Sequence, residues 1–504
     1  MPLRHLRPAP QALAALGAGL ALPLAFAPFG LFPLAPLALA VLFSLWRSAT
    51  PRRALFLGYL FGLGYFGFGV SWVAVSMYRF GGMGMLLSVL ATLLFVFFLA
   101  GFPALVGWLW RRGFARARPV LGLLCALPAL WVLLEWTRGW FLTGFPWLAV
   151  GYSQTDSPLA GLAPVLGVYG VSLAVATSAA LLVFAVAEPA RRGRTLTALG
   201  LLWALAAGLG QVDWSRPAGE PLRVSLIQGN VPQNLKWRPD QRQPTIELYT
   251  RLSRAAFADS DIVIWPETAL PAYYHQAERF LRGLAQEAAP ATLLVGLPVR
   301  PASDPAHYYN ALVAMSEPPQ FYFKSHLVPF GEYIPLKSLL GGLLDILHVP
   351  MADFSRGAHE QAPLAVAGQF LAVSICYEDA FGEEVIRDLP EATVLVNVSN
   401  DAWFGDSLAP PQHLQMARMR SLETARPMLR ATNNGISAII DHHGDVLVRS
   451  PQFRVYSLHG TAQPRSGATP YATTGNYSLL GLLGLCLLLA AARRGDGGAA
   501  ARRV

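Results

Sequence analysis

Residues 371–379 read Leu-Ala-Val-Ser-Ile-Cys-Tyr-Glu-Asp, a short and mostly apolar run that ends at a cysteine and two acids. Such a run, followed by polar residues, is typical of a buried β-strand. Comparable runs recur on both sides, separated by stretches of helical pattern. We predict further strands at 222–228, 261–265, 292–297, 309–315, 393–398, 436–441 and 446–449, and helices at 241–257, 274–289, 380–388 and 411–425. This alternation predicts an α/β layered domain of about 250 residues, which is enough for one large core.

Three strand ends in this region carry reactive side chains. Cys376 follows the run at 371–375, and Glu267 stands in Trp-Pro-Glu after the run at 261–265. Lys324 lies in Phe-Tyr-Phe-Lys-Ser-His, and it is one of only three lysines beside 36 arginines. A lysine kept where arginine is otherwise used indicates a need for a compact ammonium group.

A cysteine nucleophile needs a base that takes its proton and a positive charge that stabilises the developing oxyanion. Glu267 and Lys324 supply both without a histidine. Taken singly, the three residues have ordinary interpretations as a buried core cysteine, a turn carboxylate and a solvated lysine. Their order, glutamate then lysine then cysteine, resembles that of the nitrilase superfamily. The resemblance implies that Glu267, Lys324 and Cys376 form a catalytic triad.

The sequence before this domain is almost continuously apolar. The chain is 54% hydrophobic and only 14% charged, and the apolar residues are concentrated in 1–215 and 477–492. A membrane helix needs roughly 20 apolar residues. We predict eight spans, at 9–28, 31–46, 54–76, 83–110, 119–137, 163–187, 196–211 and 477–492. The first is interpreted as a retained span and not as a cleaved signal peptide, because further apolar segments follow at once.

These spans divide the chain into three predicted domains. Residues 1–215 hold spans one to seven, residues 216–470 form the catalytic domain, and residues 471–504 hold the last span and a tail. Sixteen arginines lie in one set of connecting segments and in the termini, whereas the alternate short loops hold only Arg79 and Arg138. Because cytoplasmic loops are enriched in Lys and Arg, both termini are predicted to be cytoplasmic and the catalytic domain to lie on the far side of the membrane.

The net charge of +9 belongs to the membrane part of the chain. Residues 216–470 hold 21 Lys and Arg against 25 Asp and Glu, and the remainder holds 18 against 5. The globular part therefore has no basic stripe, which excludes nucleic-acid binding.

Cysteine and histidine spacing gives no sign of a metal site. The three cysteines form no CxxC pair, so neither a disulfide framework nor a zinc site is indicated. The histidines weighed as ligands are His326, His413, His442 and His443. They show no HExxH or similar spacing, and we predict no metal and no cofactor.

Over its whole length, the chain resembles the apolipoprotein N-acyltransferases, which are membrane-bound members of the nitrilase superfamily. The strings that carry the resemblance are Gly-Phe-Pro-Trp (144–147), Gly-Tyr-Ser-Gln (151–154), Gln-Gly-Asn (228–230), Trp-Pro-Glu (265–267), Lys-Ser-His-Leu-Val-Pro-Phe-Gly-Glu-Tyr (324–333), Cys-Tyr-Glu (376–378), Asn-Asp-Ala-Trp-Phe-Gly (400–405) and Gln-His-Leu-Gln-Met-Ala-Arg (412–418). The resemblance implies eight transmembrane helices and an α-β-β-α sandwich. Two places depart from it: Ala425 stands where the family often has glycine, and Asn433-Asn434-Gly435 ends a segment that often carries threonine. We expect both to affect packing only.

The family implies a two-step acyl transfer. An acyl chain leaves a membrane phospholipid as a thioester on Cys376, and then passes to the α-amino group of the diacylglyceryl-cysteine of an apolipoprotein. Glu267 would act as the base, and Lys324 would stabilise the oxyanion with the backbone N–H of Tyr377. The implied location is a bacterial inner membrane with the catalytic domain in the periplasm, and a monomer suffices.

The same resemblance adds three supporting residues. Glu332 and Glu378 would hold the lysine and the cysteine loop through charge-assisted hydrogen bonds, although either could be an ordinary surface acid. Trp237 would lie at the substrate entrance, although it could be an apolar loop contact.

Several alternatives stay open at this point. A membrane-tethered amidase or lipid hydrolase would share the triad and would use water as the acceptor. A transporter is disfavoured, because the spans lack a ladder of buried charges and an inverted repeat. The leucine-rich segment 336–351 is either a helix on the domain core or an apolar lid. Glu135 and Arg138 are membrane-boundary anchors, residues that help bind a lipid headgroup, or residues that fix the nearby loop at 144–147 beneath the active site.

Overall fold

The computed structural model describes residues 7–115, 117–302, 304, 306–333 and 354–492. These residues form two compact units. One contains residues 7–72, 89–212 and 474–492, and the other contains residues 73–88 and 213–473. The predicted helix or lid at 336–351 lies outside the described residues.

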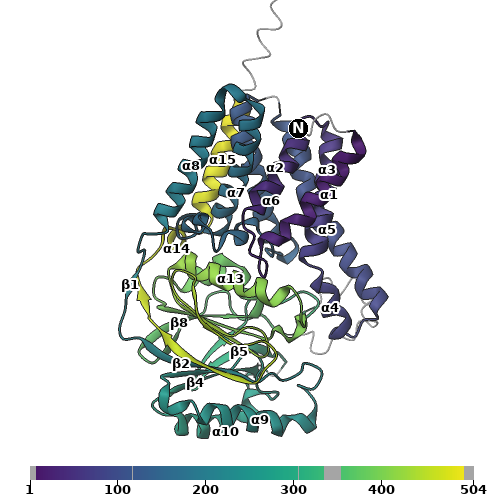
Figure 1. The fold of residues 1–504 in the computed structure, drawn as a ribbon. Helices are drawn as coiled ribbons and strands as arrows, with labels where there is room; N and C mark the ends of the chain where they lie inside the picture. Colours follow the sequence, from purple (N-terminus) through teal and green to yellow (C-terminus); the bar gives the residue numbers. More distant parts are fainter. Residues whose placement is uncertain (1–6, 116, 303, 305, 334–353, 493–504) are drawn as a thin grey trace, which may run out of the picture. The chain divides into compact units, whose positions relative to one another are not determined.

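The first unit is built of helices, and each predicted span contains one (Figure 1). They are α1 (Pro8–Ala21), α2 (Leu34–Trp46), α3 (Pro51–Gly69), α5 (Met85–Gly113), α6 (Leu127–Arg138), α7 (Ala163–Ala187), α8 (Arg192–Leu209) and α15 (Tyr477–Ala492). A π-helical stretch at Val120–Ala126 precedes α6. The predicted second span begins late, at Leu34, because Pro33 offers no N–H to a preceding turn.

Four stretches among the described residues are long and apolar enough to cross a membrane: Pro8–Ala25, Met85–Gly113, Val120–Arg138 and Pro158–Ala187. A fifth is counted if α3 and α4 (Trp72–Arg79) form one span, although they are bent by 50° where Val70 leaves the helical conformation. Helices α2 and α15 have only 13 and 16 residues. The helices fit a membrane domain. By length and apolarity, however, only four or five of the described stretches could cross a membrane, so the predicted number of eight is not confirmed.

The second unit contains two six-stranded sheets. The first has the order β13-β2-β3-β4-β5-β6, with β2 (Leu222–Gln228), β3 (Ile262–Ile264), β4 (Thr292–Val299), β5 (Tyr309–Ala314), β6 (Gln320–Phe323) and β13 (Tyr456–Ala462). The second has the order β12-β11-β10-β9-β8-β7, with β7 (Leu364–Val366), β8 (Gln369–Ile375), β9 (Val394–Ser399), β10 (Met428–Thr432), β11 (Ala438–Ile440) and β12 (Val446–Arg449). Strands β2–β3–β4 and β8–β9–β10 pair in parallel, and the outer strands pair antiparallel.

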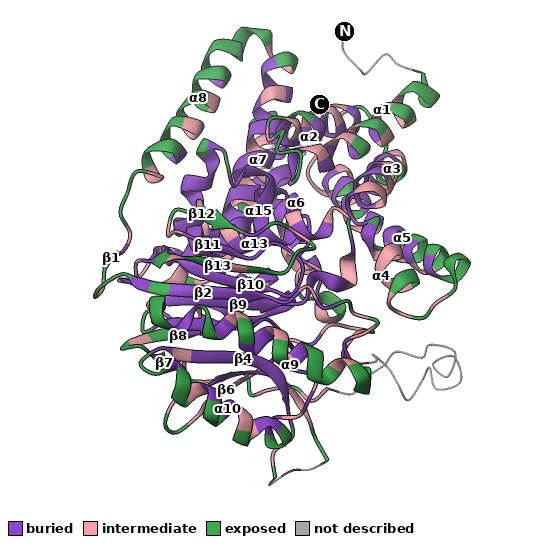
Figure 2. Cartoon of the chain, turned by 60° about the horizontal axis from the view of Figure 1, so that its bottom comes forward, coloured by how far each residue is buried: buried purple, intermediate pink, exposed green. Residues whose placement is uncertain are grey.

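The two sheets pack face to face with helices outside, which gives an α-β-β-α sandwich (Figures 1 and 2). Alternate side chains of both sheets, such as Leu226 and Val396, meet in the central core. The other face of the first sheet packs on α9 (Pro239–Arg254) and α10 (Tyr274–Ala288). The other face of the second sheet packs on α13 (Ala409–Thr424). Figure 2 shows the inner strands almost wholly buried, as expected of parallel strands covered on both faces.

All eight predicted strands are present, but the prediction missed six others. The missed strands are β6, β7, β10, β13, and the short pair β1 (Arg216–Pro217) and β14 (Arg465–Ser466). The helix predicted at 380–388 is present only in pieces, as a short α-helix at Gly382–Val385 between 3-10 helices at Cys376–Ala380 and Ile386–Asp388.

Ala425 corrects the expectation that its departure from the family affects packing only. It ends α13 in the left-handed conformation, with φ +50° and ψ +44°. Glycine is favoured there because a Cβ atom is strained at positive φ. The departure therefore concerns the backbone.

Candidate active site

The topology brings the three predicted catalytic residues to strand ends that face one another. Glu267 follows β3, and Cys376 directly follows β8. Strand β5 is antiparallel to both β4 and β6, so β6 runs in the same direction as β3 and β4. Lys324, which follows β6, therefore lies at the same sheet edge as Glu267. The segment before Glu267 passes close to β4 at Gly296. Only glycine fits at this position, since a Cβ atom there would lie 2.2 Å from the Pro266 carbonyl oxygen.

Lys324 is a buried ammonium between two carboxylates. Its Nζ lies 2.9 Å from a Glu332 oxygen and 3.5 Å from Glu267 Oε1. Burial lowers the pKa of Lys324, but the Glu332 and Glu267 carboxylates outweigh burial and hold the pKa above its ordinary value. Lys324 is thus a fixed positive charge.

Asn310 on β5 joins the two carboxylates. Its Nδ2 donates to Glu267 Oε1 at 2.7 Å and to Glu332 Oε1 at 3.0 Å. The backbone carbonyl oxygen of Asn310 accepts a hydrogen bond from the backbone N–H of Lys324 at 2.8 Å. Glu332 also accepts the N–H of Val328 at 2.9 Å. Each carboxylate is therefore oriented by hydrogen bonds before any substrate binds.

Cys376 is held in a strained conformation beside these charges. Its φ is +55°, in the left-handed region that side chains rarely adopt. Burial raises the pKa of the Cys376 thiol, and Glu267 raises it further, whereas Lys324 lowers it. Both charged groups therefore act on the thiol. The resting form is the thiol, so nucleophilic attack requires a proton acceptor.

Glu378 connects the lysine segment to the cysteine segment. Its Oε1 accepts the N–H of Ser325 at 2.7 Å and of His326 at 2.9 Å. Its Oε2 accepts the N–H of Ile375 at 2.7 Å and the hydroxyl of Tyr322 at 3.1 Å. One buried carboxylate thus fixes the residues that flank Lys324 and the residue before Cys376.

A buried charge cluster, formed by Asp379, Asp401, His413 and Arg430, supports the cysteine loop. Arg430 lies 3.0 Å from an Asp379 oxygen and 3.2 Å from an Asp401 oxygen. His413 contacts the same two acids, at 2.9 and 3.0 Å. All four are at most 1% exposed.

The charge cluster also reaches the backbone of Cys376. Nε2 of His413 and Nδ2 of Asn397 each lie 3.3 Å from the Cys376 carbonyl oxygen. Burial and Arg430 lower the pKa of His413, but Asp379 and Asp401 raise it to about 9. The protonated imidazole can donate to the acids and to this carbonyl.

Sequence reasoning missed several of these residues. Asn310 lies within the predicted strand 309–315 but carries no signal of its own, and Arg430 lies in β10, which the sequence does not predict. Lys236 was noted only as one of three lysines, yet its Nζ donates to the Glu267 carbonyl oxygen and to Thr268 Oγ1, both at 3.2 Å. Burial lowers its pKa to about 8, against the opposing effect of Glu267. The scarcity of lysine was the signal that could have identified it.

The remaining predicted residues have different environments. Tyr377 packs its ring edge-on against Phe381, with centroids 5.0 Å apart. Trp237 is 38% exposed beside the buried Lys236. The boundary-anchor interpretation of Glu135 and Arg138 is wrong, because both are buried in the first unit.

Glu135 and Arg138 instead fix the loop at 144–147 and the residues after it. Arg138 donates to the carbonyls of Phe145 and Trp147, both at 2.6 Å. Glu135 accepts the N–H of Val150 at 2.8 Å.

Known proteins match both parts of the chain. Residues 18–181 match the family described as apolipoprotein N-acyltransferase N-terminal domain, and residues 223–459 match the family described as carbon-nitrogen hydrolase. Among solved structures, a carbon-nitrogen hydrolase from Helicobacter pylori G27 covers 48% of this chain and 89% of its own, with 15% identity and a TM-score of 0.38.

Relatives of similar length match the whole chain. The apolipoprotein N-acyltransferase of Methylococcus capsulatus is 51% identical over 94% of this chain and 95% of its own. The apolipoprotein N-acyltransferase of Nitrosomonas europaea is 48% identical over 94% of this chain and 96% of its own. The apolipoprotein N-acyltransferase of Azotobacter vinelandii is 46% identical over 96% of this chain and 95% of its own. The chain belongs to the apolipoprotein N-acyltransferase family.

Proposed function

We propose that this protein moves an acyl chain from a membrane phospholipid, through a thioester on Cys376, to the α-amino group of the diacylglyceryl-cysteine of apolipoproteins. The observation that carries the proposal is the buried Lys324 ammonium between Glu267 and Glu332, within electrostatic reach of Cys376. The family supports the choice of donor and acceptor.

In the first half-reaction, Glu267 accepts the thiol proton and the Cys376 thiolate attacks the ester carbonyl carbon. The carbonyl π electrons move to oxygen, where Lys324 and the backbone N–H of Tyr377 stabilise the negative charge. Collapse of this intermediate breaks the ester C–O bond. The departing lysophospholipid takes the proton from Glu267, and the acyl group stays on sulfur.

In the second half-reaction, the apolipoprotein amine attacks the thioester carbonyl. Glu267 accepts a proton from the attacking nitrogen, the C–S bond breaks, and the Cys376 sulfur takes that proton back. The same lysine stabilises both oxyanions. Glu332, Asn310 and Glu378 keep these groups in place, so little reorganisation is needed at the moment of reaction.

The proposed organisation follows the arginine distribution. Residues 1–215 and 471–504 would form eight spans of a bacterial inner-membrane protein with both termini in the cytoplasm, and residues 216–470 would form the periplasmic catalytic domain. Helices α2, α8 and α15 are then the short spans. The proposed state is a monomer, with Trp237 at the substrate entrance.

The test incubates purified protein with phosphatidylethanolamine labelled in its acyl chains. We expect one labelled acyl group per chain, removable by neutral hydroxylamine, in wild type and in the control Cys125→Ser, and none in Cys376→Ala. Adding a diacylated lipopeptide should then transfer the label to its amino group. Label retained on Cys376→Ala would refute the thioester. Free fatty acid as the only product would indicate a lipid hydrolase.

A further inference from the structure

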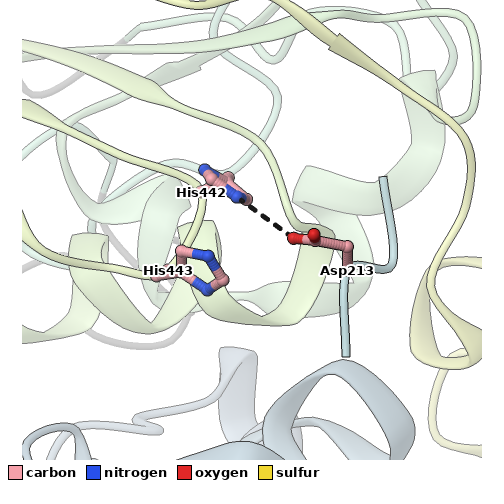
Figure 3. Close-up of side chains that lie close together, drawn as sticks. All are labelled: Asp213, His442 and His443. Atoms are coloured by element: carbon pink, nitrogen blue, oxygen red, sulfur yellow. Dashed lines mark ion pairs between the residues drawn. The ribbon is translucent and has the colours of Figure 1, made fainter. Parts of the chain in front are cut away.

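A second cluster of potential ligands lies away from the catalytic residues (Figure 3). It contains Asp213, where the chain returns to the second unit after residue 212, and His442 and His443, which occupy the turn between β11 and β12. One ligand atom from each residue lies within 4.8 Å of the other two. Nε2 of His442 is 3.9 Å from Asp213 Oδ1, and the two imidazole rings have centroids 3.9 Å apart.

The turn that presents the histidines is fixed by its own hydrogen bonds. Oδ1 of Asp441 accepts the N–H of His443 at 2.9 Å and of Asp445 at 2.8 Å. The Asp441 carbonyl accepts the N–H of Gly444, whose φ of +78° suits a residue without a Cβ atom. Both imidazoles therefore project from a defined backbone and need only side-chain rotation to converge.

The charges around the cluster favour a cation. Asp213 and Asp441 contribute two negative charges, and Arg465 contributes one positive charge. Nη2 of Arg465 is 3.8 Å from Asp213 Oδ1, which is longer than a direct hydrogen bond. The guanidinium is instead bound to Ser215, at 2.7 Å to its hydroxyl and 2.6 Å to its carbonyl. The three groups together carry one net negative charge. Because Arg465 is hydrogen-bonded to Ser215, the Asp213 carboxylate can bind a metal ion.

We propose that Asp213, His442 and His443 form a binding site for a divalent transition metal, with Zn²⁺ as the best-suited ion. Two imidazoles and a carboxylate are ligands that zinc accepts, and three protein ligands leave a coordination position for water. Bound metal would tie the segment at Asp213 to the β11–β12 hairpin. We expect the site to be independent of the Cys376 chemistry.

The test uses full-length protein in detergent, purified with an affinity tag that lacks histidine and stripped with EDTA. Zinc binding is measured by titration calorimetry for wild type, His442→Ala, His443→Ala and Asp213→Asn. The control is His459→Gln, which replaces an exposed histidine elsewhere on the same unit. Thermal unfolding is measured for each protein with EDTA and with zinc.

We expect wild type and His459→Gln to bind one Zn²⁺ per chain, and the three ligand variants to bind at least about tenfold more weakly. Zinc should raise the unfolding temperature of wild type and of the control only, because a ligand that binds the folded state stabilises it. In EDTA the three ligand variants should unfold at the wild-type temperature. Unchanged zinc affinity in His442→Ala or Asp213→Asn would overturn the site, and so would an equal loss in His459→Gln.

Discussion

Replacing Arg430 by methionine tests the charge cluster beneath Cys376. Methionine has a similar length but no charge, so the change removes the guanidinium and leaves Asp379 and Asp401 in contact with His413. The formal charge of the cluster falls from zero to minus one, and its members are at most 1% exposed. Breaking a buried ion pair by removing one partner costs about 3–5 kcal/mol.

This cost predicts a large loss of thermal stability. At roughly 2–4 °C per kcal/mol for a domain of this size, Arg430→Met should lower the unfolding temperature by about 6–20 °C. The measurement is thermal unfolding in detergent at pH 7, followed by tryptophan fluorescence. The control is Arg254→Met, which breaks an exposed pair with Glu287, where the side chains are 57% and 48% exposed, and should change little. An Arg430→Met midpoint equal to that of Arg254→Met would refute the reasoning.

The same variant has a defined pH dependence. Burial raises the pKa of Asp401, but Arg430 and His413 outweigh burial and hold the pKa below its ordinary value. Such a group stabilises the fold above its unfolded pKa, near 4, and the contribution is lost as pH falls. Without Arg430, the pKa of Asp401 should rise. The stability gap between variant and wild type should therefore be largest near neutral pH and should narrow on acidification.

Three further predictions concern single residues. Ala425→Gly should raise the free energy of unfolding by about 1 kcal/mol, because it removes the strain of a Cβ at positive φ; lower stability in denaturant titration would contradict this. In a Cys125→Ser, Cys486→Ser background, Glu267→Gln should slow the alkylation of Cys376 by iodoacetamide at pH 7 and abolish the acyl-enzyme, because the buried thiol loses the group that accepts its proton; alkylation at the wild-type rate would contradict the role of Glu267 as the base. The pKa of His413 is raised to about 9 in the folded protein. Its protonated form therefore stabilises the fold fully below about pH 6.5, the ordinary pKa of histidine, and this contribution is lost as pH rises through 9. Wild type should lose up to about 3 kcal/mol over that interval, and His413→Gln should show no such slope.

The strands that could be read from the sequence are those whose side chains are apolar on both faces. Ile262–Ile264 and Val394–Ser399 are buried along their whole length, and they lie in the middle of the two sheets. Met428–Thr432 was missed because it contains Arg430, and a charge within a short run is normally read as a loop. Its burial depends on two acids that lie far from it in the sequence, so no local pattern could reveal it.

The candidate site was partly predictable for a similar reason. Glu267, Lys324 and Cys376 each follow a strand, and their order carries the resemblance. Asn310 could not be distinguished from other residues in its strand, because its role appears only when Glu267 and Glu332 converge on its amide. The cluster at Asp213 was equally hidden, since its ligands come from segments at opposite ends of the second unit.

The hydrogen bonds of Glu378 also constrain how the site can open. The amide protons of Ser325, His326 and Ile375 share one carboxylate, so none can exchange with solvent unless the lysine and cysteine segments separate. These protons should exchange slowly and as a group, with the kinetics of one cooperative unit. Admission of a bulky lipid or a lipoprotein would then leave this unit closed. Motion during turnover would then be confined to other segments.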